Sequence, residues 1–119
     1  MLRILIVDDD ADCAEALGDT LQDVGYQVAM VGSATAALRR LESERPSLIV
    51  LDLVMPGMSG EEFLARHHGD PSLSGIPVIV LTATPSEFRA IDGRTPVLRK
   101  PVDPTELLEL VTLMTATRG

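Results

Sequence analysis

Residues 48–60 read Leu-Ile-Val-Leu-Asp-Leu-Val-Met-Pro-Gly-Met-Ser-Gly, and this stretch decides the fold. Its first four residues, Leu48–Leu51, form an apolar run typical of a strand that is buried on both faces of a sheet. Asp52 follows where the strand leaves the core, and a proline and two glycines then indicate a turn. The turn is too long for Asp52 to cap the next helix, which Ser59 caps more naturally. Because reactive groups collect at the carboxyl ends of strands in α/β sheets, we interpret Asp52 as functional.

Apolar strands and amphipathic helices alternate along the rest of the chain. The strands are expected at residues 3–7, 26–31, 48–51, 76–81 and 96–98. The helices are expected from near Asp12 to Val24, after Ser33, from Ser59 to about His68, and from Pro104 onward. Residues 83–95 are ambiguous, and 86–92 could form two helical turns. The first helix is placed near Asp12 because Asp12 and Glu15 resemble a capping box.

This alternation predicts βαβ units with right-handed crossovers. The expected fold is α/β and flavodoxin-like: a doubly wound five-stranded parallel sheet of order 2-1-3-4-5, with five helices covering both faces. Its 119 residues are enough for one buried core, so residues 1–119 are expected to form a single domain. The topological switch point then lies between the first and third strands.

Composition excludes several classes of protein. The net charge is −8, which argues against direct binding to nucleic acid or to an anionic membrane. No apolar stretch approaches the roughly 20 residues of a membrane span, and the first apolar run is too short for a secretory signal. A single cysteine, Cys13, allows no internal disulfide. These features together indicate a cytoplasmic protein.

Acidic residues follow the two strands that flank the switch point. Asp8 and Asp9 end the first strand and Asp52 ends the third, so the topology predicts that the three carboxylates converge. Such carboxylates repel one another unless a cation lies between them, and oxygen ligands select a hard ion such as Mg²⁺. Thr82 and Lys100, at the ends of the fourth and fifth strands, can supply a hydroxyl and an ammonium to a phosphoryl group. This arrangement is typical of phosphoryl transfer to aspartate.

From Arg3 to Met114 the chain resembles the receiver domain of two-component response regulators, the CheY-like superfamily. The resemblance is carried by Asp8-Asp9, by Asp52 in Leu-Asp-Leu-Val-Met-Pro-Gly, by Thr82-Ala83 and by Lys100-Pro101. Each motif is weak alone, but their order at four strand ends is specific.

The resemblance implies a role for each of these residues. Asp52 would accept a phosphoryl group from a sensor histidine kinase or a histidine phosphotransfer protein. Mg²⁺ would be held by Asp8, Asp9, Asp52 and the backbone carbonyl of Val54. Lys100 would bind the phosphoryl group, Thr82 would be the switch hydroxyl, and the Lys100-Pro101 bond would be cis. The domain would promote only its own phosphorylation and dephosphorylation, so it is not expected to be an enzyme in the ordinary sense.

The chain departs from the family pattern in its signalling residues. Val97 stands where the family usually has an aromatic residue, and the interval from Thr82 to Lys100 is about one helical turn shorter, so the fourth helix should be short. The family also places polar side chains two residues beyond the phosphoacceptor and the threonine, where this chain has Val54 and Thr84. The sequence therefore does not specify the signalling output, that is, the change in conformation or partner binding that follows phosphorylation. Formation of a weak homodimer is one such output.

Two other functions remain as alternatives. A receiver-like binding module that is not phosphorylated would usually lack an acid or the lysine, and none is missing here. A phosphatase with an aspartyl nucleophile usually has a second acid two residues later, where Val54 stands. A nucleotide-binding function is excluded because the chain has no P-loop motif.

Several other polar or aromatic residues are given structural interpretations. The side chain of Asp10 is expected to be a solvated loop acid and Cys13 a small helix residue without chemistry. His67 and His68 are adjacent on a helix, where their side chains should diverge, so they are not expected to bind a metal. Phe63 and Phe88 are expected to pack in the core.

Overall fold

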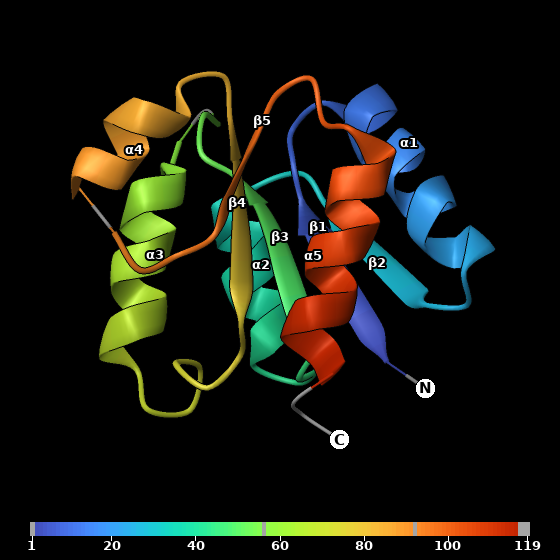
Figure 1. Cartoon of the computed structure of the whole chain (residues 1–119). Helices are drawn as coiled ribbons and strands as arrows, with labels where there is room; N and C mark the ends of the chain where they lie inside the picture. The colour runs from blue at the N-terminus through green and yellow to red at the C-terminus, as the bar shows by residue number, and fades with distance from the viewer. Residues whose placement is uncertain (1, 56, 92, 117–119) are drawn as a thin grey trace.

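The computed structural model describes residues 2–55, 57–91 and 93–116, and its centre is a five-stranded parallel sheet (Figure 1). The strands are β1 (Arg3–Val7), β2 (Gln27–Val31), β3 (Leu48–Asp52), β4 (Val78–Thr82) and β5 (Val97–Arg99). They are arranged in the order β2-β1-β3-β4-β5, as predicted. In the register, Val7 of β1 lies beside Leu51 of β3, so the residues that follow these two strands emerge next to each other.

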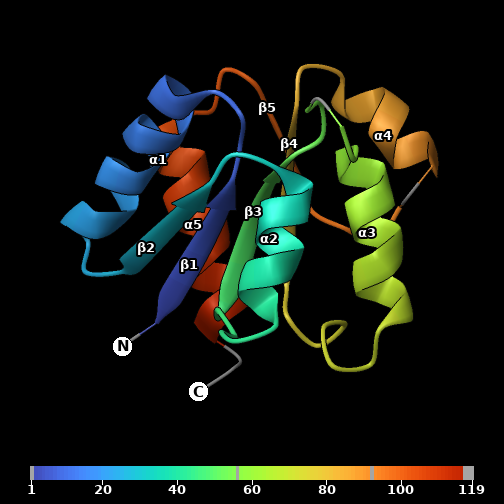
Figure 2. The ribbon, with the colours of Figure 1, turned by 180° about the vertical axis from the view of Figure 1, so that it is seen from behind.

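Helices cover both faces of the sheet, and Figures 1 and 2 show the two sides. The helices are α1 (Ala11–Asp23), α2 (Ala34–Leu41), α3 (Gly60–Gly69), α4 (Pro85–Ile91) and α5 (Pro104–Ala116). Ile4 and Ile6 of β1 belong to the core beneath α1 and α5, whereas Leu5 and Val7 belong to the core beneath α2, α3 and α4. This alternation along one buried strand explains why apolar residues fill the strand without a break.

Side-chain caps set where the helices begin. Ser33 accepts a hydrogen bond from the backbone N–H of Ala36, and Ser59 accepts one from Glu62, so both predicted serine caps are confirmed. The first helix begins at Ala11, one residue from the predicted start near Asp12, but Asp12 is not its cap. Asp10 is the cap of α1, because its carboxylate accepts hydrogen bonds from the two N–H groups that follow Ala11. Asp10 is exposed, as predicted, but it also has this capping role.

The other boundaries lie close to the sequence predictions. Strand β4 begins at Val78 rather than Ile76, since Pro77 has no N–H to donate to a neighbouring strand. The ambiguous segment forms α4, a helix of seven residues, which confirms the expected short fourth helix. Phe63 and Phe88 are buried in the core, and the Lys100-Pro101 bond is cis, both as predicted. Among the described helices, none is long and apolar enough to cross a membrane.

Candidate functional site

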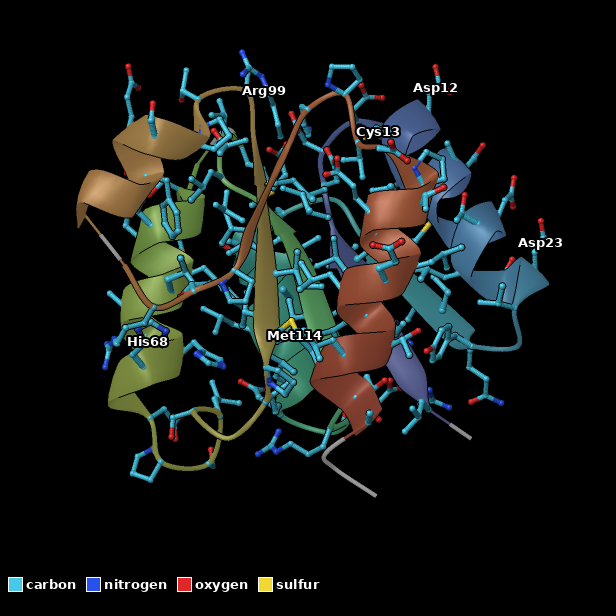
Figure 3. The ribbon with its side chains drawn as sticks, in the orientation of Figure 1. Asp12, Cys13, Asp23, His68, Arg99 and Met114 are labelled. Atoms are coloured by element: carbon cyan, nitrogen blue, oxygen red, sulfur yellow. The ribbon has the colours of Figure 1, made fainter. Side chains whose placement is uncertain are left out.

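The candidate site is the carboxyl edge of the sheet, where the predicted acids and the lysine emerge. Asp8 directly follows β1, Asp52 is the last residue of β3, and Lys100 directly follows β5. In Figure 3 this edge lies at the top, where Cys13 of α1 and Arg99 of β5 are labelled. The side chains of Asp8 and Asp52 are buried because the strands that carry them are central in the sheet, whereas Asp9 is exposed.

Three carboxylates meet at this edge. One oxygen from each of Asp8, Asp9 and Asp52 lies within 4.8 Å of the others. The Nζ atom of Lys100 lies 3.4 Å from Oδ2 of Asp8 and 3.2 Å from Oδ2 of Asp52. One ammonium offsets one of three negative charges, so the ionised cluster is left with two negative charges. A divalent cation would balance them.

Each buried carboxylate divides its two oxygens between the backbone and the lysine. Oδ1 of Asp8 accepts a hydrogen bond of 2.9 Å from the N–H of Asp10, and Oδ1 of Asp52 accepts one of 3.3 Å from the N–H of Val54. Oδ2 of each residue faces Lys100. The local turns after β1 and β3 therefore hold the two carboxylates with one oxygen each directed into the site.

Electrostatics make the charge on Asp52 unfavourable without a cation. Burial raises the pKa of Asp52 and the neighbouring Asp8 raises it further, while Lys100 lowers it again without cancelling the effect. For Lys100, burial lowers the pKa, but the charges of Asp8 and Asp52 raise it more, so the pKa lies above its ordinary value. The lysine is thus charged at neutral pH.

Thr82 lies at the end of β4, between the strands that carry Asp52 and Lys100. Its side chain is buried, and its Oγ1 accepts a hydrogen bond of 3.1 Å from the N–H of Thr84. The two threonine Oγ1 atoms are 3.4 Å apart. In this structure the hydroxyl of Thr82 is thus tied to its own loop. The side chain of Val54, by contrast, is 78% exposed.

Cys13 lies in α1, as the sequence predicts, and its thiol is close to Asp8 at this edge of the sheet. Burial raises the pKa of its thiol to about 11, and a hydrogen bond to Asp8 adds to this effect. The thiol is therefore neutral at pH 7 and lies beside the acidic pocket. Its position in the first turn of α1 follows from the cap at Asp10, which accepts a hydrogen bond from the N–H of Cys13.

The adjacent histidines lie away from this edge. The Nε2 atom of His67 is 2.7 Å from the carbonyl oxygen of Ile76, so it carries the proton and donates. The ring of His67 is buried, whereas His68 is exposed, with the ring centroids 5.2 Å apart. His67 therefore joins α3 to the loop that precedes β4.

The acidic cluster fits a hard divalent cation by the chemistry of its donors. All three donors are carboxylate oxygens, and Mg²⁺ is typically held by one or two carboxylates together with water and phosphate oxygens. Within residues 2–55, 57–91 and 93–116, Asp8, Asp9 and Asp52 form the single group of three or more acidic, histidine or cysteine side chains close enough to share an ion.

Comparison with known proteins places this geometry in a family. Residues 4–112 match the family described as "Response regulator receiver domain". The DNA-binding response regulator MtrA of Mycobacterium tuberculosis (strain ATCC 25618 / H37Rv) is 37% identical over 113 residues, covering 92% of this chain and 48% of its own length. An uncharacterised 14.6 kDa protein of Leptolyngbya boryana is 41% identical over 114 residues, covering 92% of this chain and 87% of its own length. The chain thus spans about half the length of MtrA.

Solved structures agree with the sequence matches. The signal receiver domain of a signal transduction histidine kinase from Syntrophus aciditrophicus superposes with a TM-score of 0.91 at 32% identity, covering 98% of this chain and 92% of that one. The chemotaxis response regulator CheY4 of Vibrio cholerae superposes with a TM-score of 0.85 at 27% identity, covering 96% of this chain and 98% of that one.

Proposed function

The chain belongs to the family of response regulator receiver domains, and on this premise we propose that Asp52 accepts a phosphoryl group from a phosphohistidine. The donor is a sensor histidine kinase or a histidine phosphotransfer protein. The observation that carries the proposal is the ion pair of Asp52 with Lys100 at the end of a buried strand, where the same lysine also pairs with Asp8 and the carboxylates of Asp8 and Asp52 lie within 4.8 Å of each other. We further propose that residues 1–119 form a single receiver domain and that this domain acts in the cytoplasm.

The transfer exchanges one bond to phosphorus for another. A carboxylate oxygen of Asp52 attacks the phosphorus atom, and the phosphorus–nitrogen bond to the histidine ring breaks. The electron pair of that bond returns to the imidazole nitrogen, which takes up a proton, and an acyl phosphate remains on Asp52. The domain is consumed as the acceptor in each transfer, so it modifies itself and is not an enzyme acting on an external substrate.

The residues around Asp52 prepare it for this step. Asp8, Asp9 and the carboxylate of Asp52 would hold Mg²⁺, with the backbone carbonyl of Val54 as a further ligand. The ion supplies positive charge that offsets the repulsion between these acids and an incoming phosphoryl group. Lys100 already lies 3.2 Å from Asp52, so its ammonium can contact the phosphoryl oxygens.

The hydroxyl of Thr82 would respond to the modification. Phosphorylation adds about −1.5 to −2 charges and strong hydrogen-bond acceptors at Asp52, which lies on the neighbouring strand. This change can draw the hydroxyl of Thr82 away from Thr84, to which it is bonded in the present structure. The switch then alters the conformation of the domain or its binding to a partner.

Intact mass after incubation with acetyl phosphate and Mg²⁺ tests the proposal. The wild type should gain one phosphoryl group, and the gain should disappear with chelator or with Asp52→Asn. Asp12→Asn, which changes an exposed acid in the first turn of α1, is the matched control and should behave as the wild type. Equal uptake by Asp52→Asn would disprove the assignment, and no uptake by the wild type would favour a binding module that is not phosphorylated.

A further inference from the structure

The peptide that follows Asp52 is held from two sides. The N–H of Leu53 donates a hydrogen bond of 3.1 Å to the carbonyl oxygen of Leu81, at the end of β4. The carbonyl oxygen of Leu53 accepts a hydrogen bond of 3.0 Å from the N–H of Gly60, the first residue of α3. The side chain of Leu53 is itself buried in the core. The phosphoacceptor therefore lies next to a peptide fixed between a strand and a helix.

Gly60 allows this contact because it has no side chain. A Cβ atom on Gly60 would lie 2.6 Å from Cα of Leu53, 2.9 Å from the carbonyl oxygen of Asp52 and 3.0 Å from Cδ2 of Leu53. Two of these atoms belong to the backbone, so a rotamer change cannot relieve the overlap. The backbone of Gly60 does not have a positive φ, unlike Gly57 in the same loop. Close packing, and not backbone conformation, therefore requires glycine at this position.

The overlap would act on the reacting group itself. One of the atoms that a side chain would meet belongs to Asp52, so any relief within β3 would move the phosphoacceptor. The other relief is to move α3 outward, which would break the hydrogen bond between Gly60 and Leu53. Either response disturbs the turn in which the N–H of Val54 holds Oδ1 of Asp52.

We propose that Gly60 is a positioning residue for phosphoryl transfer, because its missing side chain lets α3 fix the peptide that orients Asp52. This inference rests on the proposed function of Asp52. The contact sets the direction of the carboxylate and of the Val54 peptide relative to Lys100 and the acids that follow β1. Gly60 itself touches neither phosphorus nor metal.

Gly60→Ala tests this proposal against Gly18→Ala as the matched control. Gly18 lies within α1, and a Cβ atom there would meet side-chain atoms at 3.5 Å or more, which is ordinary van der Waals contact. Alanine has the higher helix propensity, so neither exchange is unfavourable for the helix itself. At saturating Mg²⁺ and acetyl phosphate, we expect Gly60→Ala to slow phosphorylation per folded molecule by at least about tenfold, since small misplacements of reacting groups reduce rates strongly. Gly18→Ala should stay within about twofold of the wild type.

Two further readouts separate positioning from a loss of stability. The first is the folded fraction from circular dichroism, by which the phosphorylation rate is divided. The second is a titration with Mg²⁺, which gives the maximal phosphorylation rate separately from the Mg²⁺ concentration at half of that rate. A variant that is merely less stable would keep its maximal rate per folded molecule, and this result would overturn the proposal. If the wild type itself takes up no phosphate, the proposed function of Asp52 is wrong, and the proposal for Gly60, which rests on that function, is overturned with it.

If Gly60→Ala does not fold, amide hydrogen exchange in the wild type tests the positioning role of Gly60 instead. The amide of Gly60 should exchange at least about 100-fold more slowly than an exposed loop amide such as that of Gly32, because it is bonded to Leu53. Addition of Mg²⁺ should slow its exchange further, while the amide of Gly18 should respond only as the rest of α1 does. Fast exchange at Gly60, or no response to Mg²⁺, would overturn the proposal.

Discussion

Lys100 forms an ion pair with Asp52, although β4 lies between the strands that carry them, with Nζ of the lysine 3.2 Å from Oδ2 of the aspartate. The same Nζ lies 3.4 Å from Asp8, so one ammonium serves two buried carboxylates. The side chain of Lys100 is 26% exposed, and its long stem carries the charge across the end of β4. The ammonium group of Lys100 therefore links the carboxylate that follows β1 to the carboxylate at the end of β3.

Replacement of Lys100 by glutamine should slow phosphorylation of Asp52 by roughly 10²-fold, the size of effect expected when one charged stabiliser of a transition state is lost. Glutamine keeps hydrogen-bond donors near the site but removes the charge. The rate of mass gain with acetyl phosphate measures the effect. Arg99→Gln removes a neighbouring exposed positive charge and is the control, and an equal loss in both variants would show that the charge acts only at long range.

Mg²⁺ should raise the melting temperature, because the ion binds the folded acidic cluster and not the unfolded chain. At a concentration of about 100 Kd the gain in the free energy of unfolding is roughly 2.7 kcal/mol. Asp9→Ala should abolish this gain, whereas Asp12→Ala, an exchange of another exposed acid, should keep it. Thermal unfolding with and without Mg²⁺ provides the measurement. If Asp9→Ala keeps the full gain, Asp9 is not a ligand.

The acyl phosphate on Asp52 should be long-lived, because Val54 cannot hydrogen-bond to an attacking water. The exposed residue Val54 lies two positions beyond the phosphoacceptor. Thr84, two positions beyond Thr82, has only a hydroxyl with which to bind the attacking water. Val54→Asn should shorten the lifetime several-fold. Decay of the phosphorylated mass after removal of the donor measures this. Val54→Ala is the control for size alone, and decay within seconds in the wild type would contradict the prediction.

Acid should weaken the fold through His67. Burial lowers the pKa of His67, the hydrogen bond to Ile76 opposes this and His68 lowers it further, so in the folded protein the pKa lies below its ordinary value of 6.5. As the pH falls below about 6.5 the unfolded chain binds the proton first, and stability is lost until the pH reaches the folded pKa. The loss is at most about 1.4 kcal/mol per pH unit.

Urea unfolding between pH 7.5 and 5 measures this loss. The Nδ1 atom of His67 is buried and has no hydrogen-bond partner among the described residues, so a proton added there would meet no acceptor among them. His67→Gln should remove this contribution to the pH dependence, and the exchange of exposed His68 by glutamine should leave it in place. Identical pH profiles for the wild type and His67→Gln would refute the assignment.

The conformational response to phosphorylation should be concentrated in the loops after Thr82 and Asp52. Val97 is small and stiff at χ1, so its side chain cannot rotate inward as the aromatic side chain usual in the family would. In addition, α4 has only seven residues that could move. Amide shift differences between the free and beryllofluoride-bound domain test this. Large shifts over α4, β5 and the exposed face of α5 would contradict the prediction, and any dimer is expected to use another surface.

The carboxyl-end site could be predicted from the sequence because its parts are encoded locally. Asp8 and Asp52 each follow an apolar run, and Lys100 precedes a proline at the end of another such run. In a parallel sheet all strands end at the same edge, so the order of the strands alone brings these residues together.

Other features were decided only by the tertiary structure. The Asp10 cap, the thiol of Cys13 beside Asp8 and the contact between Gly60 and Leu53 each depend on how a helix is seated against the sheet. His67 finds its acceptor in a loop nine residues away for the same reason. Periodicity in a sequence specifies which elements form and in which direction they run. The contacts between these elements are set by the packing of the whole core.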